Sequence, residues 1–214
     1  MSLFESARFL TSAAQVNQLP PAGLPEIAFA GRSNAGKSTT INVLTRQGRL
    51  AFASKTPGRT QLVNFFNLSR KTGEGKKAGR EDIAFLVDLP GYGYAQANEN
   101  VKAQWGKMIE DYLHKSKQLK LVFLLIDIRH APSENDRIMY DWIRRNGYDP
   151  IIIATKLDKI NRSQIQKQIK LIRTTLQAGA DTQIIPYSAQ TKQGREEIYE
   201  ILDGVLAAEN PAQE

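Results

Sequence analysis

The residues best suited to do chemistry lie in the run GRSNAGKS at positions 31–38. Their spacing matches GxxxxGK[ST], in which successive backbone N–H groups surround phosphate oxygens. In such a loop Lys37 reaches the β- and γ-phosphates of a nucleoside triphosphate, and the Ser38 hydroxyl is a ligand of Mg²⁺. A chance glycine-rich turn is the alternative, but the strand-forming segment before the run and the helix-compatible segment after it favour a P-loop. The predicted phosphate contacts are Gly31, Arg32, Ser33, Asn34, Ala35, Gly36, Lys37 and Ser38.

A second run, DLPG, ends an apolar segment at positions 88–91. An acidic residue at the end of a strand can hold Mg²⁺ through water, and the N–H of the following glycine can sense a γ-phosphate. A simple turn would also explain this short run. Because it follows a P-loop, the run predicts nucleotide contacts from Asp88, Leu89, Pro90 and Gly91.

A third run, TKLD, follows the apolar segment PIIIA. The carboxylate of Asp158 can accept two hydrogen bonds from guanine, whereas adenine presents an acceptor at N1 and would mispair. The aliphatic stem of Lys156 would lie along the base. A solvated loop is the alternative, but together with the first two motifs guanine recognition is favoured. The predicted base contacts in this run are Thr155, Lys156, Leu157 and Asp158.

The elements that must position these residues alternate in type, as in a layered α/β domain with a mainly parallel sheet. Six strands are expected, at 26–31, 61–68, 82–89, 119–128, 150–155 and 182–188. Three apolar stripes at helical spacing are expected to pack on them. These stripes lie at 101–112, 165–176 and 198–206, and Ser163 with Gln166 predicts a capping box at the start of the second.

Composition bounds the remaining possibilities. The chain has 214 residues, 41% of them hydrophobic, and no cysteine, which excludes structural disulfides and cysteine-ligated zinc. The two histidines, His114 and His130, have no partner at metal-ligand spacing. The start lacks the pattern of a signal peptide and the longest apolar run is too short to cross a bilayer, so a cytoplasmic protein without a membrane span is expected.

The expected organisation is a three-layer P-loop domain at 26–208, with helices on both faces of a six-stranded sheet. An extension at 1–25 is expected to pack on this domain, and 209–214 form a flexible tail. A polar segment at 69–80 interrupts the domain and holds five basic residues against one acidic residue, so it carries most of the net charge of +7. Its candidate RNA-binding residues are Arg70, Lys71, Lys76, Lys77 and Arg80; a solvated hairpin is the alternative.

Six motifs in this chain are shared with one known family. They are GRSNAGKS (31–38), TPGRTQ (56–61), DLPGYGYA (88–95), DIRH (127–130), TKLD (155–158) and YSA (187–189). Together they resemble the EngB-type ribosome-biogenesis GTP-binding proteins of bacteria, a branch of GTPases that includes Era and the tRNA-modification GTPases. The resemblance runs from Glu26 to the last helix, and TPGRTQ, DLPGYGYA and DIRH are more specific than the P-loop.

The resemblance implies further site residues. Thr60 is similar to the switch threonine that completes the Mg²⁺ shell, within a nucleotide-sensing loop that comprises Gly58, Arg59, Thr60, Gln61 and Leu62. Residues similar to the base-contacting loop are Tyr187, Ser188 and Ala189. No catalytic acid or base is implied; Lys37, Thr60 and Gly91 would contact the transition state. Thr155 stands where an asparagine is commoner, which affects affinity more than base choice.

Three residues bear on hydrolysis and on the site's framework. Tyr92 follows Gly91 where fast GTPases often have a glutamine that orients water, so slow intrinsic hydrolysis is expected. Asn34, by resemblance to the tRNA-modification GTPases, either helps hold K⁺ near the phosphates or only shapes the loop. Asp127 is expected to bind Arg129 or a backbone N–H.

The sequence is compatible with two functions. One is a slow GTP/GDP switch in assembly of the large ribosomal subunit, bound to rRNA and ribosomal proteins of the precursor, with an associated need in cell division and septation. The other is a cell-division factor that acts through protein contacts without direct ribosome binding. Neither involves DNA specificity or a membrane span, and a monomer is expected although dimerisation is not excluded.

Overall fold

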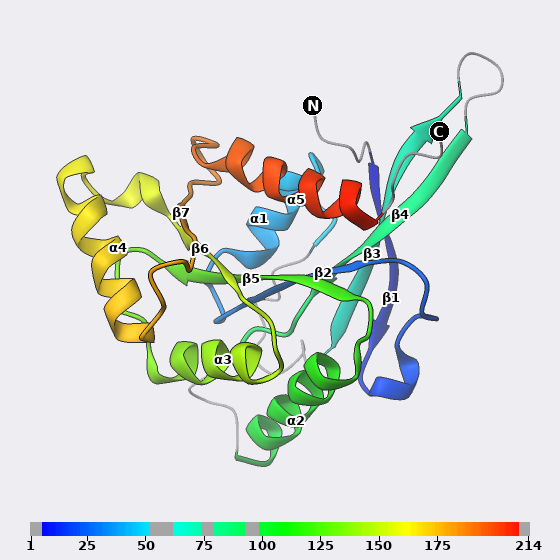
Figure 1. The fold of residues 1–214 in the computed structure, drawn as a ribbon, viewed down its shortest axis with the longest axis horizontal. Coiled ribbons are helices and arrows are strands. Elements are labelled where there is room, and N and C mark those ends of the chain that lie inside the picture. The colour runs from blue at the N-terminus through cyan, green and yellow to red at the C-terminus, as the bar shows by residue number, and fades with distance from the viewer. Residues whose placement is uncertain (1–5, 52–61, 74–78, 93–98, 210–214) are drawn as a thin grey trace.

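A computed structural model describes residues 6–51, 62–73, 79–92 and 99–209, with side chains described except at 16 and 99–105. In this part of the chain seven strands form one sheet in the order β1-β3-β4-β2-β5-β6-β7 (Figure 1). The strands are β1 (Ser6–Ala13), β2 (Glu26–Gly31), β3 (Val63–Thr72), β4 (Gly79–Asp88), β5 (Leu119–Asp127), β6 (Ile151–Thr155) and β7 (Ile184–Pro186). Strand β3 is antiparallel to β1 and β4, and the other neighbouring strands are parallel.

Helices cover both faces of this sheet, so the α/β P-loop fold class is confirmed. The helices are α1 (Lys37–Leu44), α2 (Glu99–Lys115), α3 (Glu134–Arg145), α4 (Arg162–Leu176) and α5 (Arg195–Glu209). One apolar core joins α2, α3 and α4 to one face, and a second joins α1 and α5 to the other (Figure 1). The buried central strands therefore consist of near-continuous apolar runs, as expected of a sheet covered on both sides.

The described sheet has one strand more than the six expected. Strand β1 adds an antiparallel edge to β3, so the N-terminal extension enters the sheet. Its register shifts between Phe9 and Thr11, which marks a β-bulge. A bulge breaks the alternation of inward and outward side chains, and this explains why the sequence pattern did not predict the strand.

Two helix starts differ from expectation. Helix α4 begins at Arg162 with Asn161 as its cap, where the Gln164 Oε1 atom accepts a hydrogen bond from the Asn161 N–H at 3.0 Å. The capping box at Ser163 was therefore placed two residues too late. Helix α3, which was not expected, begins after Ser133, whose N–H donates to the Asp136 carboxylate at 2.7 Å.

Candidate nucleotide-binding site

The P-loop lies where the carboxyl end of a central strand meets a helix. Strand β2 ends at Gly31 and α1 begins at Lys37, which confirms the predicted strand–loop–helix order. Gly36 has a φ of +95°, a conformation that side chains rarely adopt. This backbone geometry leaves the N–H groups at the start of α1 available to an anion.

Lys37 and Asp88 come together from the loop and the end of β4. The Lys37 Nζ atom lies 2.6 Å from the Asp88 Oδ1 atom, and the side chains are only 10% and 5% exposed. Ser38 follows at the first turn of α1 and is half-buried. The site thus combines one cation with carboxylate and hydroxyl oxygens, which are the hard ligands that Mg²⁺ prefers.

The segment after Asp88 is pinned against the P-loop. The Tyr92 carbonyl accepts a hydrogen bond from the Ser33 N–H at 2.9 Å. A Cβ atom on Gly91 would lie 3.2 Å from the Ser33 nitrogen, so only glycine fits this approach without displacement. The Leu89 side chain is buried in the core, and its N–H donates to the Phe29 carbonyl.

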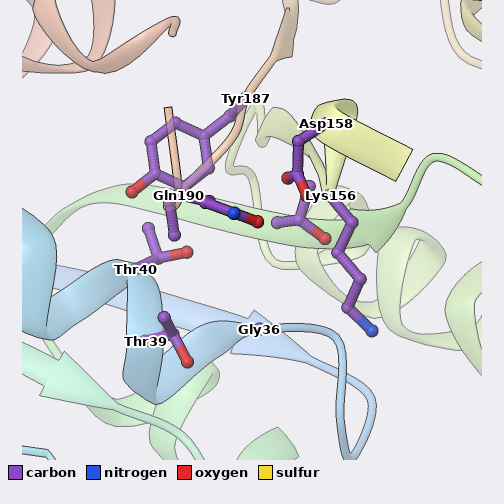
Figure 2. Close-up of a pocket in the computed structure, with 9 residues that line it drawn as sticks. Gly36, Thr39, Thr40, Lys156, Asp158, Tyr187 and Gln190 are labelled. Atoms are coloured by element: carbon purple, nitrogen blue, oxygen red, sulfur yellow. The ribbon is translucent and has the colours of Figure 1, made fainter. Parts of the chain in front are cut away.

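A pocket opens beside this loop, between α1 and the ends of β6 and β7 (Figure 2). Asp158 and Tyr187 reach it from the sheet side, and Thr39 and Thr40 reach it from α1 (Figure 2). Its lining residues are Gly36, Thr39, Thr40, Thr155, Lys156, Asp158, Tyr187, Ala189 and Gln190. Burial raises the pKa of the Tyr187 phenol to about 12, so this side chain presents a neutral ring.

The carboxylate of Asp158 is held in place by its neighbours. Its Oδ1 atom accepts a hydrogen bond from the Ser188 Oγ atom at 2.7 Å, and Lys159 lies 3.1 Å from its Oδ2 atom. The hydrogen bond from Ser188 lowers the pKa of Asp158, with a smaller contribution from Lys159. At neutral pH the pocket therefore presents an ionised group that can only accept hydrogen bonds.

Thr155 ties β6 to the P-loop. Its Oγ1 atom lies 2.7 Å from the Ala35 carbonyl oxygen and 3.2 Å from that of Ile126, and both are acceptors for its hydroxyl. The side chain is buried, so these contacts are shielded from water. The hydroxyl thus connects the end of β6 to the loop between β2 and α1.

Lys156 adds a second connection between these loops. Its Nζ atom donates to the Asn34 carbonyl at 2.7 Å and lies 2.8 Å from the Asp127 Oδ2 atom. Arg129 also contacts Asp127 through its Nε atom at 2.9 Å and its backbone N–H at 3.1 Å, so both expected partners of Asp127 are found. Partial burial alone would raise the pKa of Asp127, but the hydrogen bonds from Arg129 and Lys156 hold it well below its usual range.

Comparison with known proteins identifies the family. Residues 26–156 match the family model described as "50S ribosome-binding GTPase". The chain is 56% identical over 188 residues to "Probable GTP-binding protein EngB" of Lachnospira eligens, with 88% of this chain and 83% of the relative covered. It is 45% identical over 202 residues to the protein of that name from Alkaliphilus metalliredigens, covering 94% and 91%.

The chain belongs to the EngB family of GTP-binding proteins. A solved structure titled as a probable GTP-binding protein engB shares its fold with a TM-score of 0.66 at 25% identity, covering 86% of this chain and 99% of that one. An Era structure with MgGDPNP and nucleotides of 16S ribosomal RNA has a TM-score of 0.61 at 17% identity, covering 86% and 57%. Membership of this GTPase family implies GTP binding and hydrolysis in general.

Several predicted residues of this EngB-family GTPase lie outside the described part. These are Gly58, Arg59, Thr60, Gln61, Lys76 and Lys77. Leu62 is described and half-buried, and Arg70, Lys71 and Arg80 lie on β3 and β4. Within the described ranges no group of three or more histidine, cysteine or acidic side chains could hold a metal ion, and no helix is long and apolar enough to cross a membrane.

Three pocket residues were not predicted. Thr39 and Thr40 follow Ser38 on α1, and Gln190 follows the YSA motif. Each follows a predicted motif directly, and extending each motif by one or two residues would have found them.

Proposed function

We propose that this EngB-family GTPase is a slow GTP/GDP switch in assembly of the bacterial large ribosomal subunit. The observation that carries the proposal is the match of residues 26–156 to the family described as 50S ribosome-binding GTPases. The net charge of +7 supports a polyanionic partner such as rRNA. The partner is a precursor particle with its rRNA and ribosomal proteins, and the site of action is the cytoplasm.

In this proposal the P-loop residues 31–38 hold the phosphates. In the structure the Lys37 ammonium group is neutralised by the Asp88 carboxylate, 2.6 Å away. When GTP enters, this ammonium group leaves the carboxylate and binds phosphate oxygens instead. Mg²⁺ fits the hydroxyl of Ser38 and, through water, Asp88; by family resemblance Thr60 completes the set. When bound, the ion neutralises negative charge on the phosphates.

The base lies in the pocket between α1 and Asp158. The ionised carboxylate accepts hydrogen bonds from guanine N1–H and N2–H₂, and Ser188 keeps it oriented through the 2.7 Å hydrogen bond. The neutral Tyr187 and Ala189 complete the wall of this pocket. Adenine offers no matching pair of donors, so selectivity for guanine follows from Asp158.

The position of Tyr92 supports slow hydrolysis. The side chain is 1% exposed and its hydroxyl donates to the Asp136 Oδ1 atom at 2.8 Å, within the core. A hydroxyl that donates its hydrogen bond to Asp136 of α3 cannot also orient a water molecule at a γ-phosphate. Turnover of many GTP molecules per second by the purified protein alone would contradict this part of the proposal.

Potassium near Asn34 would be a further contribution to catalysis. Asn34 has a φ of +63° and its carbonyl accepts a hydrogen bond from Lys156, which also supports a role that only shapes the loop. Turnover measured in K⁺ and Na⁺ buffers, for wild type and Asn34→Ala, distinguishes the two roles. Equal rates in all four cases reject a potassium site.

The ribosomal role is tested by sedimentation of cell lysate with GDP or a non-hydrolysable GTP analogue. We expect the protein to migrate with the large-subunit precursor in one nucleotide state and much less in the other. A division defect in cells that lack the protein would then follow from deficient ribosomes. Absence from ribosomal fractions in both states favours the alternative, a division factor that acts through protein contacts.

A further inference from the structure

The hairpin formed by β3 and β4 brings two cations face to face. Lys71 and Arg80 are direct cross-strand partners in the antiparallel register, and both are exposed. Directly opposite side chains lie on the same face with their Cβ atoms roughly 4.5–5.5 Å apart. Within the described residues neither side chain has an ion pair or a hydrogen bond to an acidic group.

The neighbouring charges on the same hairpin are compensated. Arg70 lies on the opposite face, with its Nε atom 2.8 Å from the Oε2 atom of its cross-strand partner Glu81. Asp82 accepts hydrogen bonds from Asn67 at 2.8 Å and from Ser69 at 2.6 Å. The pair formed by Lys71 and Arg80 therefore differs in kind from its neighbours, because like charges directly opposite destabilise a strand pair.

A third cation lies on the same face. Arg8 of β1 is the cross-strand partner of Asn67, and both side chains contact the Asp82 carboxylate. Asp82 pairs with Ser69, and Arg80 and Lys71 lie two residues from them along each strand, on the same face. The Arg8 NH2 atom lies 2.6 Å from the Asp82 carboxylate, yet the side chain is 68% exposed. Among the described residues this face thus holds three basic side chains and one carboxylate, so its net charge is positive.

We propose that Lys71 and Arg80, flanked by Arg8, form a face that binds the phosphate backbone of RNA. The proposal rests on the ribosomal function proposed above and adds which side of the hairpin meets the nucleic acid. A phosphate between the two cations turns their repulsion into attraction, and the guanidinium group of Arg80 matches phosphate geometry. Arg70 is excluded from the contact, because Glu81 neutralises it on the other face.

The face is remote from the nucleotide pocket. Strand β4 runs from Arg80 at the hairpin to Asp88 at the P-loop, a separation of roughly 26 Å at about 3.3 Å per residue. Figure 1 shows this end of β3 and β4 projecting beyond the helices. Substitutions in the face should therefore leave GTP hydrolysis unchanged.

The test uses a fluorescent single-stranded RNA of about 30 uridines as the polyanion, titrated with the full chain at several salt concentrations. The variant Lys71→Gln/Arg80→Gln should bind roughly 25-fold more weakly near 0.1 M salt, with a salt slope shallower by about 1.4, because each lost phosphate contact removes about 0.7 from the slope. The matched variant Arg70→Gln/Glu81→Gln should bind like wild type. Melting should show that the first variant is as stable as wild type or more stable, since a repulsive pair is gone.

Wild-type affinity and slope in Lys71→Gln/Arg80→Gln would overturn the proposal, and so would an equal loss in both variants. The proposal would also be overturned if Lys71→Gln/Arg80→Gln bound RNA normally but no longer sedimented with ribosomal particles, since the face would then contact an acidic protein. If the RNA result fails but nucleotide-dependent sedimentation persists in both variants, only the RNA-binding face is refuted. If wild type also fails to sediment with the large-subunit precursor in either nucleotide state, the proposed ribosomal function itself is refuted.

Discussion

Replacing Tyr92 by phenylalanine separates stability from catalysis at this site. The substitution removes the hydroxyl that donates to the buried Asp136 Oδ1 atom, while Ser133 still donates to Oδ2 through its N–H and its hydroxyl at 2.7 Å each. A buried hydrogen bond to a charged group contributes about 1.5–3 kcal/mol, and the two remaining donors place the loss at about 1–2 kcal/mol. For a chain of this length, that loss lowers the melting temperature by about 2–8 °C.

Hydrolysis should change little in the same variant, because the hydroxyl points into the core. The assays are thermal melting without nucleotide and single-turnover phosphate release from GTP. Burial and then Asp136 hold the pKa of Tyr92 well above its ordinary value, so the hydroxyl stays protonated and the stability effect should be constant from about pH 6 to 9.

Tyr112→Phe is the matched control. The Tyr112 hydroxyl donates to the buried carboxylate of Glu26 at 2.7 Å, in the same core but at the other end of the sheet. The melting temperature of Tyr112→Phe should fall by about as much as that of Tyr92→Phe, and its GTP hydrolysis should stay normal. A tenfold loss of hydrolysis in Tyr92→Phe alone would refute the argument, as would an unchanged melting temperature.

Three further substitutions test the contacts between the loops. Asp127→Asn should weaken GDP binding about 5–20-fold in a fluorescent-nucleotide titration, because Lys156 loses a charge partner; an unchanged affinity would contradict this. The pKa of Asp127 is depressed in the folded protein, so the stabilisation by its ionised carboxylate is complete above about pH 4 and is lost as the pH falls further. The difference in unfolding free energy between wild type and Asp127→Asn should therefore narrow only below about pH 4. Ser188→Ala should weaken GDP binding about 5–10-fold, because Asp158 keeps its charge but loses a hydrogen-bond donor. ADP should still fail to compete with GDP in a competition titration, and loss of the preference for guanine would contradict this prediction. Thr155→Val removes the hydroxyl that donates to the Ala35 carbonyl and should lower the melting temperature by about 2–8 °C. A melting temperature equal to that of wild type would show that this hydrogen bond does not stabilise the fold.

The predictable part of the fold was the part with strong apolar patterns. Strand β2 was predicted to the residue because its six positions are all buried between two helical layers. Helix α3 was missed because it has a strongly charged exposed face, although its buried Met139, Tyr140 and Ile143 follow the helical spacing. The pair of Ser133 and Asp136 at its start was a capping signal that the sequence already carried.

The predictable part of the site was the set of motifs, since their order along the chain places them at one edge of the sheet. What the sequence did not reveal is how the motifs hold one another. The bonds from Thr155 to Ala35 and from Lys156 to Asn34 join residues that are 120 and 122 positions apart. Such contacts depend on tertiary geometry, in which β6 and the P-loop meet only after the sheet has formed.

The measurement that tests the account most directly is the affinity of the purified protein for purified large-subunit precursor in each nucleotide state. Wild type should bind at least tenfold differently with GDP and with a non-hydrolysable GTP analogue. The variant Asp158→Asn should lose this difference with guanosine nucleotides and regain it with xanthosine nucleotides, because the introduced amide can donate to the C2 carbonyl that replaces the guanine amino group. Equal affinity of wild type in both nucleotide states would contradict the account.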